Sequence, residues 1–207
     1  MPISPARQKA FGILCRVGAG RGYAVDLLQQ DEVSRLTDAD RRLTTEIVMG
    51  VLRWRGELDF QIERLSGKPM KYFDSEVATI LRMGVYQLRY LRKIPRSAAV
   101  NESVELAKAA RKRSAAGLVN AVLRKCQPAG MQLAEPAGAL RNPESREAAR
   151  RTLPHWILER WEHIFGYDAT MALAFASNQI PPTTLRARKG RREAIQQSLA
   201  KEGIQTE

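Results

Sequence analysis

Apolar residues recur at helical spacing through the first 130 residues, and the two-residue alternation typical of strands is absent there. The pattern predicts seven helices joined by short loops, over residues 4–17, 24–30, 38–55, 58–65, 75–93, 95–107 and 114–126. Start signals support several of them, namely Ser4-Pro5, Asp74 or Ser75, Pro95 and Ser114. We therefore expect residues 1–130 to form a mainly α fold, an all-α helical bundle.

The pattern changes after residue 130. QPAGMQLAEPAGALRNP is rich in proline, glycine and alanine, which predicts a linker over residues 131–152 that is helical in part. Residues 153–207 then predict two helices, a strand at Thr183–Arg188, a helix near Ala194–Leu199 and the opening of a second strand at Ile204–Glu207. Because strands need pairing partners, we expect a small α/β segment that is truncated at the end of this chain.

The net positive charge of the chain predicts a polyanionic partner. The chain has 34 Lys and Arg against 22 Asp and Glu, a formal net charge of +12, which favours nucleic acid or an anionic membrane surface. Residues 76–125 alone hold 11 basic against 3 acidic residues. No apolar run approaches the length of a membrane span, and there is no signal sequence, so we expect a cytoplasmic protein with no membrane partner.

The basic residues gather at two helix junctions. One junction holds Arg89, Arg92, Lys93 and Arg96, and the other holds Lys108, Arg111, Lys112 and Arg113. We expect the two junctions to form one electropositive edge that contacts RNA phosphates, with Arg7, Lys9 and Arg82 extending it. Tyr86 and Tyr90 are candidates for stacking on unpaired bases, although packing at a helix boundary is the alternative. Asn120 and Arg124, one turn apart, are expected to brace the bundle.

No catalytic or metal-binding constellation is predicted. His155 and His163 lie eight residues apart on one predicted helix. Two histidines on one helix can share a metal ion when they lie four residues apart. Glu102 and Glu105 suggest local salt bridges near Lys108. Cys15 and Cys126 are too few for a disulfide scaffold and do not have metal-site spacing. We expect no catalysis by this chain alone.

Two groups of segments resemble a known family. DRRLTTEIVMGVLRWRGELDFQI (40–62), ILRMGVYQLRYLRKIPRSAAVNESVELAKAA (80–110) and GLVNAVLRK (117–125) are similar to the NusB fold. They are most similar to the NusB-type domain that begins the RsmB (Sun/Fmu) family of bacterial 16S ribosomal RNA methyltransferases. LPHWILERW (153–161) and NQIPPTTLRARKGRREAIQQSLAKEGI (178–204) resemble the segment that joins this domain to the methyltransferase core.

The resemblance implies a function, and it implies that the catalytic residues lie outside this chain. Members of that family use S-adenosylmethionine to methylate carbon 5 of a cytosine in 16S ribosomal RNA, through two cysteines that lie downstream of the segments present here. The resemblance implies that this chain is an RNA-binding region, which positions ribosomal RNA for the methyltransferase domain of the same protein. That domain is absent from this chain. The resemblance also implies that the protein is a monomer. A free-standing NusB-type transcription antitermination factor and a helical protein-interaction module are the alternatives.

Overall fold

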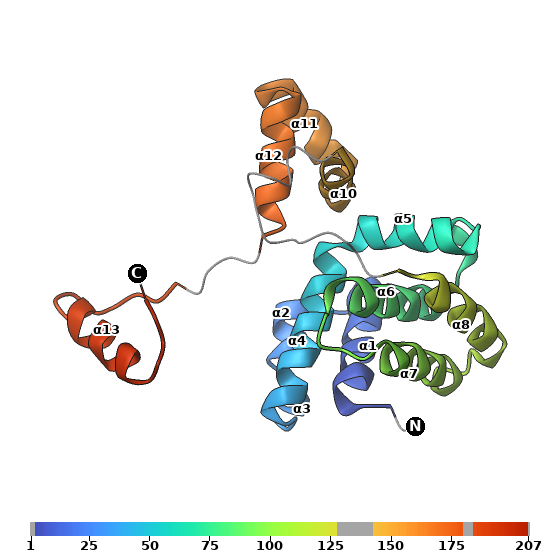
Figure 1. The fold of residues 1–207 in the computed structure, drawn as a ribbon, viewed down its shortest axis with the longest axis horizontal. Helices are drawn as coiled ribbons and strands as arrows, with labels where there is room; N and C mark the ends of the chain where they lie inside the picture. Colours follow the sequence, from blue (N-terminus) through green and yellow to red (C-terminus); the bar gives the residue numbers. More distant parts are fainter. Residues whose placement is uncertain (1–2, 128–142, 180–183, 207) are drawn as a thin grey trace.

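The computed structural model describes residues 3–127, 143–179 and 184–206. Within the first range, eight α-helices and two 3-10 turns form the predicted all-α bundle (Figure 1). The helices are α1 (Pro5–Gly18), α2 (Ala24–Leu28), α3 (Asp31–Ser34), α4 (Asp38–Arg53), α5 (Arg55–Ser66), α6 (Ser75–Tyr90), α7 (Arg96–Ala109) and α8 (Ala116–Lys125). The turns are η1 (Met70–Tyr72) and η2 (Arg113–Ala115). The seven predicted helices are present, and α3 is a short additional helix in a predicted loop.

Helix α6 is the centre of the bundle. It packs against α1, α4, α5, α7 and α8, and Figure 1 shows it between the other helices. Its apolar side chains Ile80, Leu81, Met83 and Val85 are fully buried, so burial extends beyond the single stripe that the sequence pattern predicted. The C-terminal end of α6 leads into the first basic junction, and Asp74 and Glu76 at its N-terminal end pair with Lys112 of the second.

Two glycines allow helices to approach α6 closely. A Cβ atom on Gly50 of α4 would lie 1.9 Å from Cζ of Tyr86, and one on Gly84 of α6 would lie 2.6 Å from Cδ1 of Leu123. Neither distance is sterically possible, so a larger residue at either position would force the facing side chain to move. These contacts hold α4 and α8 directly against α6.

A second helical unit follows in residues 143–179. It consists of α10 (Pro143–Thr152), α11 (His155–Phe165) and α12 (Tyr167–Ser177). Ala149, Ala174 and Phe175 form its small apolar core. Helix α10 occupies the second part of the segment predicted as a linker (131–152), while residues 131–142 lie outside the described residues. The two helices predicted after residue 153 correspond to α11 and α12.

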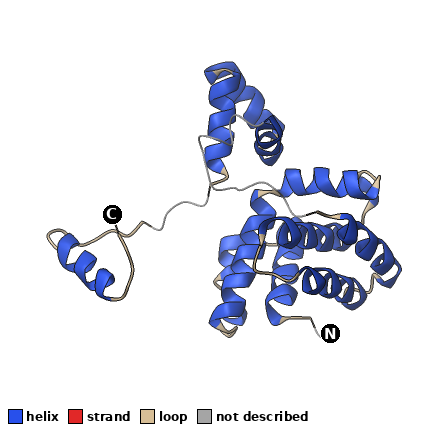
Figure 2. Ribbon diagram, viewed as in Figure 1, coloured by secondary structure: helices blue, strands red, loops and turns tan. Residues whose placement is uncertain are grey.

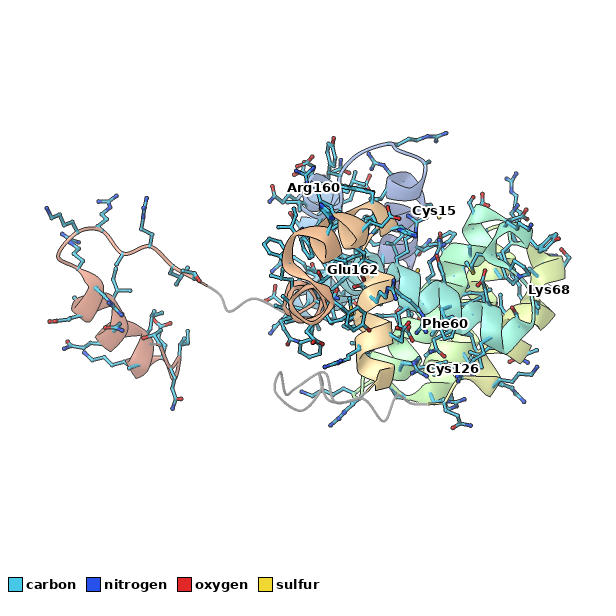
Figure 3. All side chains as sticks on the ribbon, turned by 90° about the horizontal axis from the view of Figure 1, so that it is seen from above. Cys15, Phe60, Lys68, Cys126, Arg160 and Glu162 are labelled. Carbon is cyan, nitrogen blue, oxygen red and sulfur yellow. The ribbon has the colours of Figure 1, made fainter. Side chains whose placement is uncertain are left out.

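Helix α10 docks on α5 of the bundle. The guanidinium of Arg151 lies 3.0 Å from the carboxylate of Glu57, whose side chain is 2% exposed, and Gln61 donates a further 2.6 Å hydrogen bond to that carboxylate. The guanidinium also lies 3.7 Å from the ring centroid of Phe60, which is labelled in Figure 3. The backbones approach so closely that a Cβ on Gly56 would lie 1.7 Å from the Arg151 carbonyl oxygen. The second unit is therefore anchored to the bundle.

The two predicted strands are not formed in the described residues, as Figure 2 shows. Residues 184–188 and 204–206 have no regular secondary structure, and α13 (Arg192–Lys201) lies between them as predicted. Thr183 and Glu207 lie outside the described residues. The strand prediction was wrong for the residues that can be assessed, and the physical reason is that a strand needs the backbone groups of a neighbouring strand.

Candidate nucleic-acid interface

Six basic residues surround the C-terminal end of α8, and we call them the α8-end surface. They come from the end of α6, the loop before α7, the start of α7 and the end of α8: Arg89, Arg92, Lys93, Arg96, Arg124 and Lys125. The side chains of Arg92, Lys93, Arg124 and Lys125 are exposed and have no ion-pair partner among the described residues. This surface therefore presents positive charge that no neighbouring carboxylate offsets.

Arg89 and Arg96 hold this surface together. Arg96 donates hydrogen bonds to the carbonyl oxygens of Arg124 at 2.8 Å and Leu123 at 3.4 Å, and Arg89 donates to the Gln127 carbonyl oxygen at 3.4 Å. The last carbonyl groups of a helix have no partner within that helix, and cations at this end also favour the helix dipole. The two arginines therefore fix the end of α8 beside the loop that carries Arg92 and Lys93.

The other basic junction is a tight turn between α7 and α8. The N–H of Arg111 bonds to the Lys108 carbonyl oxygen at 3.1 Å, and the N–H of Lys112 bonds to the Ala107 carbonyl oxygen at 2.8 Å. This pair of bonds is the Schellman ending of a helix, in which glycine usually takes the left-handed position. Arg111 takes it here with φ of 60°, alone among the non-glycine residues that the structure describes.

Carboxylates pair with two of the four cations of this turn. Lys112 lies 2.9 Å from Asp74 and 3.7 Å from Glu76, and Lys108 lies 2.7 Å from Glu105. The hydrogen bond to Asp74 raises the pKa of Lys112, and the hydrogen bond from Lys108 lowers the pKa of Glu105, so the pairing favours the charged forms of Lys112 and Glu105. Arg111 and Arg113 are the exposed cations of the turn without a described partner.

The two basic junctions lie at opposite ends of α7. Its fourteen residues span about 20 Å at the usual rise of a helix, so the junctions are separate patches. Arg96 begins α7 and Lys108 lies in its last turn, so a single electropositive edge that included both junctions would have to follow the length of α7. Of the two, the α8-end surface has the larger excess of unpaired charge.

Three further predicted RNA contacts are engaged within the protein. Arg7 is 5% exposed, donates to Gln87 at 2.6 Å and pairs with Glu102 at 2.9 Å, so its guanidinium is not available to a phosphate in this arrangement. Arg82 pairs with Asp59 at 2.5 Å and joins α6 to α5. Lys9 pairs with Glu32 at 2.5 Å. Sequence position indicates charge, but it does not reveal such partners from distant segments.

The two candidate stacking residues pack inside the bundle. The rings of Tyr86 and Tyr90 are stacked at 5.3 Å, and Tyr90 also stacks on Trp54 at 5.4 Å. Tyr86 is buried and its hydroxyl donates to Glu46 at 2.6 Å. Burial raises the pKa of Tyr86, and burial also raises the pKa of Tyr90 to about 12. The packing alternative is therefore the one that the structure supports.

Arg124 and Asn120 were predicted to brace the bundle together. No described hydrogen bond joins their side chains, and Arg124 is exposed at the α8-end surface. Asn120 instead lines a hollow between α7 and α8 together with Asn101 and Gly117. The sequence analysis did not identify Asn101, Gly117 or Lys125, because charge and spacing along one helix do not indicate what a neighbouring helix contributes.

Both cysteines of the chain are at least partly buried. Cys126 is buried at the end of α8 and Cys15 is partly buried, and burial raises the pKa of both thiols. No cluster of three potential metal ligands is present in the described part of the chain, and none of its helices is long and apolar enough to cross a membrane.

Comparison with known protein families matches two parts of the chain. A model described as the NusB family matches residues 4–128, and a model described as the RsmF/B-like methyltransferase ferredoxin-like domain matches residues 153–207. The first match coincides with the helical bundle and ends after α8. The resemblance that the sequence analysis identified is confirmed by both matches.

Similar proteins from several bacteria carry one name. A probable ribosomal RNA small subunit methyltransferase B of Bacillus subtilis is 31% identical over 210 residues, covering all of this chain and 46% of the relative. One of Synechocystis is 35% identical and covers 97% of this chain and 45% of the relative. The ribosomal RNA small subunit methyltransferase B of Pseudomonas putida is 37% identical over 175 residues, covering 84% and 38%. The chain thus spans less than half the length of these relatives.

Two solved structures share the fold of the bundle. A chain in the crystal structure of a plectonemic RNA supercoil has a TM-score of 0.54 and 23% identity, covering 59% of this chain and 91% of its own length. NusB of T. maritima has a TM-score of 0.53 and 19% identity, covering 61% and 92%. At these identities the likeness shows the fold alone.

Proposed function

The chain belongs to the NusB family, and we propose that its helical bundle binds ribosomal RNA through the α8-end surface. The observation that carries the proposal is the excess of cations there: four exposed side chains without carboxylate partners, held in place by Arg89 and Arg96. Binding of nucleic acid to such a surface is favourable because each neutralised phosphate releases a condensed counterion. The names of the relatives support ribosomal RNA as the class of ligand.

We further propose that the bundle positions RNA for a methyltransferase domain of a longer protein. The relatives are about twice as long as this chain and are named as methyltransferases. S-adenosylmethionine would be their cofactor, and methylation of a cytosine in 16S ribosomal RNA in the cytoplasm would be the reaction. The described residues do not fit that cofactor, because they contain no strand followed by a glycine-rich turn and a helix. We therefore assign no step of methyl transfer to this chain.

Equilibrium binding to two RNAs of equal length tests the proposal. One is a fragment of small-subunit ribosomal RNA, and the other is an unrelated sequence, each labelled for fluorescence anisotropy. We expect both to bind at low salt and the ribosomal fragment to bind more tightly. The variant Arg92→Gln/Lys93→Gln should weaken both, because these residues would contact phosphates rather than bases.

A matched control removes the same charge elsewhere. Arg21 and Arg35 are exposed arginines on the side of the bundle that carries α2 and α3, away from α8 (Figure 1). The variant Arg21→Gln/Arg35→Gln should bind RNA nearly as the parent does. Failure of the parent chain to bind either RNA at low salt would refute the proposal and favour a protein-docking role for the bundle.

A further inference from the structure

A groove runs between α7 and α8 on the outside of the bundle. It is lined by Asn101, Val104 and Glu105 of α7 and by Ala116, Gly117 and Asn120 of α8, and it forms an open hollow of about 460 Å³. This volume lies within the range of sites that hold small organic ligands. The α8 side of the groove carries the small residues Ala116 and Gly117, and no atom lies within 4 Å of the Cβ position of Gly117. The groove is therefore open to a flat ligand.

The groove connects the two basic patches. Asn120 precedes Arg124 of the α8-end surface by one helical turn, and Asn101 follows Arg96 by slightly more than one turn. At the other end, Gly117 is the second residue of α8, which follows η2, and η2 begins with Arg113. A strand of about 20 Å that follows α7 would thus begin at one set of cations and end at Arg111 and Arg113.

We propose that the α7–α8 groove holds an unpaired RNA strand, with a nucleobase in the hollow and phosphates at its two basic ends. This inference rests on the proposed RNA binding and specifies the form of RNA and its path. Two amide side chains face the hollow, and amides both donate and accept hydrogen bonds, which suits the edges of an unpaired base. A base pair within a duplex would not present those edges to a groove between two helices.

Glu105 decides where along the groove the phosphates lie. Its carboxylate lines the hollow and is charged at neutral pH, because the hydrogen bond from Lys108 lowers its pKa. A phosphate beside it would be repelled, whereas the amino and imino groups of a base would find an acceptor. The hollow is therefore assigned to a base, and the phosphates to the Arg124 end and the Arg111 end.

The substitution Gly117→Leu tests the path by filling the groove. The new side chain meets no atom within 4 Å at its Cβ, and leucine is a better helix former than glycine, so the variant should fold at least as well as the parent. Gly12→Leu is the matched control, since Gly12 is an equally open helical glycine that lines a hollow of about 380 Å³ beside α1. The probes are a short single-stranded oligouridine and a duplex RNA of the same length.

We expect Gly117→Leu to weaken binding of the single strand about tenfold, which corresponds to the loss of one base contact, and Gly12→Leu to leave it unchanged. Duplex binding should respond weakly to both. If the parent and Gly117→Leu bind the single strand equally while Arg92→Gln/Lys93→Gln still weakens binding, the groove path is wrong and the proposed function stands. If the parent binds neither probe, both fail together.

Discussion

Arg111 combines a left-handed backbone with an exposed guanidinium at the tip of the α7–α8 turn. A non-glycine residue in this conformation costs on the order of 1 kcal/mol relative to glycine. The two hydrogen bonds that close α7 involve only backbone atoms, so they do not require an arginine side chain at this position. An arginine at a position that favours glycine indicates that its side chain serves a purpose other than folding.

Replacing Arg111 by glycine should separate stability from binding. Arg111→Gly is expected to raise the free energy of unfolding by about 0.5–1 kcal/mol, because it relieves the positive φ. The same change should weaken binding of single-stranded RNA, because it removes one cation at the end of the groove. Urea denaturation and anisotropy measurements on one preparation give both quantities. A less stable variant would contradict the backbone assignment.

The stacked tyrosines at the core make stability depend on alkaline pH. A phenol whose pKa is raised by folding keeps its proton while the unfolded chain loses it, so stability is fully present below the ordinary value of 10 and falls as pH rises. For Tyr90 the fall should extend from pH 10 to about 12, and Tyr86 adds to it.

Urea denaturation at a series of pH values checks this expectation. Each tyrosine should contribute a loss of up to about 1.4 kcal/mol per pH unit within that window. The variant Tyr90→Phe should show a shallower loss than the parent. Phenols that titrate near pH 10 in the folded chain would show that the rings are accessible, as the stacking hypothesis required.

At the residue scale, the sequence predicted which side chains carry charge but not which of them are paired. Arg7 and Arg92 look alike in the sequence, yet Arg7 is buried against Glu102, which lies 95 positions away. Only the fold brings such distant partners together. The predicted interface therefore combined exposed, unpaired cations of the α8-end surface with several cations that are paired within the protein.

At the scale of elements, α10 and α5 form the contact that orients the second helical unit. Its geometry depends on the absence of a side chain at Gly56 and on the Arg151 ion pair with a carboxylate that is almost fully buried. Removal of one partner of such a pair leaves an uncompensated charge. Helix α10 is thus held on α5 by a few contacts, and each of them can be removed by a single substitution.

The substitution Gly56→Ala should undock α10 without unfolding the bundle. The added Cβ would lie 1.7 Å from the Arg151 carbonyl oxygen, so α10 must move away, while alanine favours the helical conformation of α5. We expect faster amide hydrogen exchange in α10 and unchanged exchange in α6. Gly117→Ala is the control, because its Cβ meets no neighbour. Unchanged protection of α10 in Gly56→Ala would show that this contact does not hold it.

Helices were predictable from the sequence because their hydrogen bonds are internal and their apolar stripes are local. The bounds of α4, α6 and α7 lie within a few residues of the predicted ranges. The strands at 183–188 and 204–207 were not predictable in the same way, since alternation indicates a strand only where another strand is available to pair. The composition of residues 131–152 predicted a linker that is helical in part, and α10 is that helix, but its docking on α5 could not be predicted from the sequence.

At the scale of the whole molecule, charge is distributed unevenly over a single helical bundle. The α8-end surface and the α7–α8 turn lie at the two ends of one helix, and the other side of the bundle, at α2 and α3, carries mixed charge such as the Lys9–Glu32 pair. An RNA bound at the α7–α8 side would leave α10 and the second helical unit free to orient whatever domain follows in a longer protein.

The salt dependence of RNA binding tests the central claim, phosphate contact at the α8-end surface, most directly. The logarithm of the association constant should fall linearly with the logarithm of the salt concentration for the parent chain. In Arg92→Gln/Lys93→Gln the slope should be shallower by about 1.4 units, since each of the two lost contacts with a single strand changes it by about 0.7. In Arg21→Gln/Arg35→Gln the slope should be unchanged. Equal slopes for the parent and Arg92→Gln/Lys93→Gln would contradict the assignment of this surface to RNA.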